Sequence, residues 1–186
     1  MKFRALCVGL LATLLAGCAG HATTSGPASS EPDPKVAQAW AIGDGGVTEQ
    51  EYRQAVDRYL SCMSDAGYAP GKPAISPVDG LTLLFDIEPI GVPAVWNATI
   101  DRCNLTNLSD VEPMYIEARE QVMEPRLREA TRKCLSAHAV PLTGSEHNVT
   151  EFVRSAGGSM QTVMGCVNPA LRKLFPALPH ELKVRW

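Results

Sequence analysis

The most regular pattern of apolar and polar positions lies between Val47 and Tyr68. Apolar side chains recur there at the three- and four-residue spacing of one helix face: Tyr52, Ala55, Val56, Tyr59, Leu60, Met63 and Ala66. Thr48, followed three residues later by Glu51, is a capping box, and Gly67 is typical of a left-handed C-cap. The pattern predicts an amphipathic helix that begins at Thr48 and ends before Gly67.

A change to two-residue periodicity follows this helix. A turn-rich passage with three prolines runs from Tyr68 to Val78, and Asp79-Gly80 is a hairpin signal. Apolar residues then alternate with other residues over 81–88, which predicts a strand. Residues 74–78 are the candidate partner, and Pro77 would keep that partner at an edge. A small β-hairpin is therefore expected.

Helical spacing returns in the second half of the chain. A helix is predicted over 93–104, and a longer helical stretch over 112–137 contains Pro125, which predicts two helices or a kink. A looser helical region covers 150–167, and the tail beyond Pro169 is expected to be broken by prolines. The predicted fold class is α+β and mostly helical, with disulfide-stapled helices and one small hairpin.

The first residues have the pattern of an export signal. A basic start is followed by a run of 12 uncharged, mostly apolar residues, Ala5–Ala16. A spanning helix needs about 20 such residues, so the run is too short for one. Leu15-Ala16-Gly17-Cys18 resembles the lipobox of bacterial lipoproteins, in which the cysteine takes a diacylglyceryl group and becomes the new N-terminus. The alternative is an ordinary cleaved signal, with Cys18 left as a free thiol or as a disulfide partner.

The composition divides the chain into three parts. Residues 1–17 are the predicted lipoprotein signal peptide, 18–39 the lipidated Cys18 and a flexible tether, and 40–186 a single globular domain. The tether prediction rests on residues 21–35, which are rich in Pro, Gly, Ser and Thr and too poor in large apolar side chains to form a core. The predicted location is the extracytoplasmic face of a bacterial cell membrane.

Four of the six cysteines belong to the predicted domain: Cys62, Cys103, Cys134 and Cys166. An even number on an exported chain predicts two disulfides, with three possible connectivities. We favour Cys62–Cys103 and Cys134–Cys166, because each half then has a helix ending in a cysteine, a loop, and a second cysteine on a helix. The two halves align too poorly to establish a sequence repeat. A four-cysteine zinc site usually shows Cys-x-x-Cys pairs, which this chain lacks.

Charge and motifs reduce the number of possible functions. The 186-residue chain has a net charge of −3, and removal of residues 1–17 leaves 15 basic against 20 acidic residues. An acidic chain is a poor candidate for binding nucleic acid. No His-Glu-x-x-His, Gly-x-Ser-x-Gly or phosphate-loop motif is present. We therefore expect no catalytic residue, no metal site and no cofactor.

A few isolated side chains are the remaining candidates for chemistry. His138, His147 and His180 do not share a helical turn, and we interpret them as structural. Asp86 and Glu88 lie on the outer face of the predicted strand, where a carboxylate pair for acid–base chemistry is conceivable.

One segment supports a resemblance. Gly46–Tyr68 combines a capped helix, Cys62 and a Gly-Tyr exit, and resembles uncharacterised exported lipoproteins of actinobacteria, which carry later cysteines in helices. The resemblance implies the location and the disulfides, and it implies no activity.

These observations predict a lipid-anchored cell-envelope protein that serves as a binding or interaction module of unknown ligand. The expected partners are membrane lipid, through the acylated N-terminus, and an envelope protein or small molecule. The alternatives are a hydrolase-like envelope enzyme and a passive structural or stress-related envelope protein.

Overall fold

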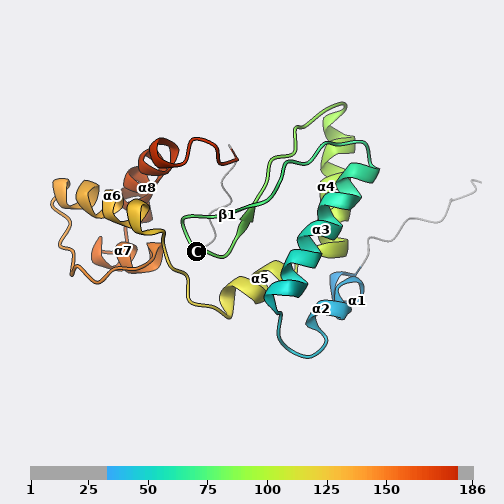
Figure 1. The fold of residues 1–186 in the computed structure, drawn as a ribbon, viewed down its shortest axis with the longest axis horizontal. Coiled ribbons are helices and arrows are strands. Elements are labelled where there is room, and N and C mark those ends of the chain that lie inside the picture. Colours follow the sequence, from blue (N-terminus) through green and yellow to red (C-terminus); the bar gives the residue numbers. More distant parts are fainter. Residues whose placement is uncertain (1–32, 180–186) are drawn as a thin grey trace, which may run out of the picture. The chain divides into compact units, whose positions relative to one another are not determined.

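Helices make up most of the chain that the structure describes. The computed structural model describes residues 33–179, and this part contains eight helices and one two-stranded antiparallel sheet (Figure 1). The helices are α1 (Pro34–Ala37), α2 (Ala39–Ile42), α3 (Glu49–Asp65), α4 (Pro93–Asn107), α5 (Val111–Glu117), α6 (Pro125–Ala137), α7 (Val149–Ser155) and α8 (Met160–Leu174). The predicted fold class is confirmed. The predicted signal peptide, Cys18 and His180 lie outside the described residues.

Helix α3 forms as its sequence predicts. The Thr48 hydroxyl accepts from the Glu51 N–H at 3.2 Å, and the Glu51 carboxylate accepts from the Thr48 N–H at 2.8 Å, which completes the capping box. Gly67 has a φ of +92° and lets the chain turn, so that the Tyr68 N–H donates to the Met63 carbonyl. This is a Schellman ending.

Helix α6 ends in the same way, although no glycine is present. Ala139 takes the left-handed position with a φ of +57°, and the Val140 N–H donates to the Leu135 carbonyl at 3.1 Å. Cys134 precedes Ala139 by the same number of residues as Cys62 precedes Gly67. The two halves therefore share a helix ending that the sequence alignment does not reveal.

Replacing Ala139 with glycine is expected to raise the free energy of unfolding by about 0.5–1 kcal/mol. The left-handed conformation costs a residue with a Cβ atom about 1–2 kcal/mol, and the greater freedom of glycine in the unfolded chain takes back part of that gain. The matched control is Ala137→Gly in the last turn of α6, which should lower stability by up to about 1 kcal/mol. Denaturant unfolding of both variants checks the opposite signs.

The predicted hairpin is present with shorter strands. Ala74–Ile75 (β1) pairs with Leu83–Leu84 (β2), and an isolated bridge joins Pro70 to Ile87. The buried Asp79 carboxylate accounts for the shortening at the turn end, because it accepts from the N–H groups of residues 81 and 82 and from the Thr82 hydroxyl. Those donors stabilise the turn and are no longer available to extend the ladder.

Two clusters of buried apolar side chains lie in the described part. The first gathers residues from α2, α3, α4, α5 and the hairpin, and the second gathers residues from α6, α7 and α8. The hairpin turn is hydrogen-bonded to the segment before α6, since the Val122 N–H donates to the Asp79 carbonyl and the Glu124 N–H donates to the Pro77 carbonyl. Val78 in the same turn packs with the second cluster.

The helical stretch predicted over 112–137 consists of two helices. Helix α5 ends at Glu117, and α6 begins with Pro125 in its first turn. The Glu124 carboxylate accepts from the N–H groups of Arg126 and Leu127, so it caps α6. The break at Pro125 is therefore a helix start.

The proline-broken tail begins later than predicted, because α8 continues past Pro169 and ends just before Phe175 and Pro176. The two adjacent glycines 157 and 158, both with positive φ, separate α7 from α8, but α8 then continues through Pro169 to Leu174. Pro169 has no N–H to donate to the carbonyl of Gly165. The buried face formed by Val163, Val167 and Leu171 maintains the helix despite this lost bond.

The folded part also begins before residue 40, which corrects the predicted end of the tether at 39. Helix α1 covers Pro34–Ala37, with Asp33 as its N-cap. Gln38 is fully buried, and its side chain is hydrogen-bonded to the region between α4 and α5. A buried side chain with four hydrogen bonds belongs to the domain, so the domain includes residues before Trp40.

Glu146 organises the loop between α6 and α7. Its side chain is 2% exposed and accepts from the Thr143 N–H (2.7 Å), the Gly144 N–H (3.0 Å) and the Ser155 hydroxyl (2.8 Å). Burial alone would raise the pKa of Glu146, but these hydrogen bonds outweigh burial and lower the pKa to about 2. The folded state therefore stabilises the ionised form of Glu146 strongly.

Replacing Glu146 with glutamine is expected to cost about 2 kcal/mol near neutral pH, because charge-assisted hydrogen bonds are lost. The folded pKa lies below the unfolded value, so this contribution is present above about pH 4.5 and declines as the pH falls toward 2. Denaturant unfolding at several pH values should show the two proteins converging in acid. Glu129→Gln, at an exposed ion-paired site, is the control and should stay within about 0.5 kcal/mol.

Candidate functional site

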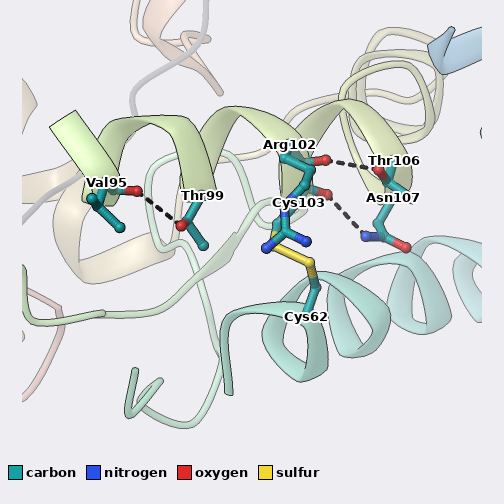
Figure 2. The surroundings of a disulfide bond; sticks show 7 residues. All are labelled: Cys62, Val95, Thr99, Arg102, Cys103, Thr106 and Asn107. Atoms are coloured by element: carbon teal, nitrogen blue, oxygen red, sulfur yellow. Dashed lines mark hydrogen bonds between the residues drawn. A yellow bond between two sulfur atoms is a disulfide. The ribbon is translucent and has the colours of Figure 1, made fainter. Parts of the chain in front are cut away.

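The Cys62–Cys103 disulfide fastens α3 to α4. The two Cα atoms are 5.8 Å apart, and Cys103 is fully buried whereas Cys62 is half-buried (Figure 2). On α4, the Thr106 hydroxyl donates to the Arg102 carbonyl and the Asn107 amide donates to the Cys103 carbonyl. Both are side-chain bonds to the carbonyl four residues earlier in the same helix, and they fix the polar side chains beside the disulfide.

An open depression of about 430 Å³ lies beside this disulfide. We call it the arginine depression, and its lining residues are Arg58, Ser61, Cys62, Asp65, Ala66, Arg102, Thr106 and Asn107. Two guanidinium groups and one carboxylate give the lining a net positive charge, although the chain as a whole is acidic. Arg58 lies 3.9 Å above the ring of Trp40, a cation–π contact that holds its side chain against α2. The arrangement is suited to an anionic group of a ligand or partner.

A second depression, of about 620 Å³, lies along the exposed face of α3. It is lined by Glu49, Gln50, Arg53, Gln54 and Asp57. Arg53 already pairs with Glu49 at 2.8 Å, and the pair is exposed. Mixed charges without an apolar wall describe a solvated helix face, so this depression is the weaker candidate.

The Cys134–Cys166 disulfide fastens α6 to α8, with the Cα atoms 5.6 Å apart. Both favoured pairings are therefore those of the structure. His138, one turn after Cys134, brings a ring nitrogen to within 4.8 Å of both sulfur atoms. The sequence alone predicts an isolated, structural His138. The i, i+4 spacing from Cys134 was the available signal, but the approach of Cys166 depends on the packing of α8.

The carboxylates considered for acid–base chemistry are not gathered in a site. Asp86 and Glu88 are exposed and follow β2, and neither lines the two depressions. His147 is exposed on another loop, with its Nδ1 atom 3.2 Å from a guanidinium nitrogen of Arg128. No observation of these groups favours an enzyme.

A buried polar pair in the first cluster has a structural role. The Tyr52 hydroxyl donates to the Glu112 carboxylate at 3.2 Å and accepts from the Leu83 N–H at 2.9 Å. Burial, together with the neighbouring Glu112, raises the pKa of Tyr52, so the phenol stays protonated. The pair links α3, α5 and β2. Both side chains are at most 2% exposed, and a substrate could not reach them.

The wider setting of the domain follows from its crosslinks. Two disulfides indicate an oxidising, extracytoplasmic compartment. Within residues 33–179, no helix has the length and apolar character needed to cross a bilayer. Comparison with protein-family models, curated proteins and solved structures finds no match to this chain.

Proposed function

We propose that the protein is a lipid-anchored module of the cell envelope that binds a partner on the extracytoplasmic side of the membrane. The observation that carries the proposal is the pairing of the cysteines. The four cysteines of the domain are joined in two pairs, so the remaining cysteines are Cys7, inside the predicted signal peptide, and Cys18, at the lipobox-like sequence, which we assign as the acceptor for lipid.

A diacylglyceryl group on Cys18 would be a stable anchor. Each buried methylene contributes about 0.8 kcal/mol, so one acyl chain holds a protein marginally whereas two hold it firmly. The part of the tether predicted over residues 18–39 that precedes Asp33 would have a reach on the order of 20 Å as a coil. That reach would let the domain meet a partner near the membrane surface.

The arginine depression is the proposed binding surface. Arg58 and Arg102 line the same open depression although they come from different helices, and the Cys62–Cys103 disulfide fixes the separation of those helices. Two guanidinium groups in one depression favour a carboxylate or another anionic group of the partner.

The anchor is tested by the intact mass of the membrane-extracted protein before and after reduction. We expect a chain that begins at Cys18 with an added lipid, takes up no alkylating reagent before reduction, and takes up four alkyl groups after it. Cys18→Ser is the control and should leave the membrane fraction. An unmodified mature chain in the aqueous fraction would contradict lipidation, and thiols that react before reduction would contradict the disulfides.

Binding is tested by crosslinking and affinity capture from the envelope fraction. We expect a reproducible envelope partner whose yield falls at least fivefold in the Arg58→Gln/Arg102→Gln double variant. The matched control is Arg172→Gln, at an exposed position on α8. Equal yields from all three proteins would show that the binding surface is not the arginine depression. The absence of any reproducible protein or small-molecule partner would contradict the proposal that the protein is a binding module.

A further inference from the structure

Three potential metal ligands meet where α6 and α8 are crosslinked. Cys134 and His138 lie one turn apart on α6, and Cys166 lies on α8. One ligand atom from each residue lies within 4.8 Å of the other two. Among residues 33–179 this is the one such group of three His, Cys, Asp or Glu side chains. The Cys62–Cys103 disulfide has no comparable third ligand in the described residues.

The oxidation state decides what this group can bind. In the disulfide the two sulfur atoms are bonded to each other, and neither is a thiolate. Reduction by a dithiol breaks the S–S bond, adds two electrons and two protons to form the Cys134 and Cys166 thiols, and converts the dithiol to its own disulfide. A metal ion can then displace the two thiol protons.

We propose that Cys134, Cys166 and His138 form a zinc site that exists only when their disulfide is reduced. Zn²⁺ binds thiolate at about 2.3 Å and imidazole at about 2.0–2.1 Å in a tetrahedron. Ligand atoms in such a tetrahedron lie about 3.3–3.8 Å apart, so a group within 4.8 Å needs only small side-chain adjustments. Two thiolates and one imidazole fill three positions, and water fills the fourth.

The three ligand residues differ in their exposure to solvent, and the exposed side lets an ion enter. His138 is exposed, Cys134 is half-buried and Cys166 is 3% exposed, so one side of the site faces solvent and the other is covered by the second cluster. The site is independent of the lipid anchor and of the arginine depression, because it shares no residue with either. The same two cysteines would thus hold α6 to α8 by a covalent bond in one redox state and by a metal ion in the other.

The test uses the full chain with Cys7 and Cys18 replaced by serine, so that the four cysteines of the domain carry the only thiols. The chain is reduced with a phosphine, which offers no competing thiol, and titrated with Zn²⁺ and with Co²⁺ as a spectroscopic probe. We expect one ion per reduced chain, a sulfur-to-cobalt charge-transfer band, and no such binding to the oxidised chain.

Paired variants locate the site. Adding Cys134→Ser/Cys166→Ser should abolish binding, Cys62→Ser/Cys103→Ser should preserve it, and His138→Ala should weaken it at least tenfold. If reduction unfolds the chain, Zn²⁺ should restore the helical circular dichroism signal of all but the first variant. Zinc binding to the oxidised chain with the same affinity, loss of binding in the Cys62/Cys103 variant, or no effect of His138→Ala would overturn the proposal, as would a reduced chain that binds no zinc.

Discussion

Replacing Cys62 and Cys103 together by alanine is expected to lower the free energy of unfolding by about 4 kcal/mol. The bond joins residues separated by 41 positions. In the chain-entropy model, removing a crosslink of that span returns conformational entropy to the unfolded chain and stabilises it by about this amount. Stabilities of single domains are about 5–15 kcal/mol, so the variant should lie near the limit of folding. Denaturant unfolding followed by far-ultraviolet circular dichroism measures the loss.

The second disulfide provides the comparison. Cys134 and Cys166 are separated by 32 positions, and the same model gives a loss only slightly smaller, again about 4 kcal/mol. A double alanine variant at those positions should therefore match the first in midpoint shift. Losses below about 1 kcal/mol in either protein would show that its unfolded chain is already constrained, and the entropic account of that crosslink would be wrong.

The features that the sequence predicted correctly depend on neighbouring residues. The capping box of α3 needs only Thr48 and Glu51, and its ending needs only Gly67 and the residues just before it. The hairpin turn likewise depends on Asp79 and the next three residues. Interactions of such short range are visible in a local pattern, which is why these elements could be identified.

The features that were missed depend on contacts between distant segments. Nothing in the local sequence separates Gln38 from the polar tether before it, because its partners lie 67 to 73 positions later. The arginine depression needs α3 and α4 to be side by side, and the approach of His138 to Cys166 needs α8 to pack on α6. At Pro169 the burial of one helix face outweighed a local rule.

Gln38 shows how much stability contacts between distant segments can contribute. Its Nε2 atom donates to the Leu105 carbonyl at 2.9 Å and to the Ser109 hydroxyl at 2.8 Å. Its Oε1 atom accepts from the N–H groups of Asp110 and Val111, both at 3.0 Å. One amide thus satisfies the last turn of α4 and the start of α5, where backbone groups have no partner within a helix.

Replacing Gln38 with leucine is therefore expected to lower the free energy of unfolding by about 3 kcal/mol, since a buried polar group left without its partner costs about 1–3 kcal/mol. Gln38→Glu keeps the acceptor atoms but loses the donor, and should also destabilise the domain. Gln54→Leu, on the exposed face of α3, is the matched control and should stay within about 0.5 kcal/mol. Denaturant unfolding of the three proteins, with both disulfides intact, measures the differences. A loss below about 1 kcal/mol for Gln38→Leu would mean that the four hydrogen bonds of Gln38 contribute little to the stability of the domain, and the role given to this residue would be wrong.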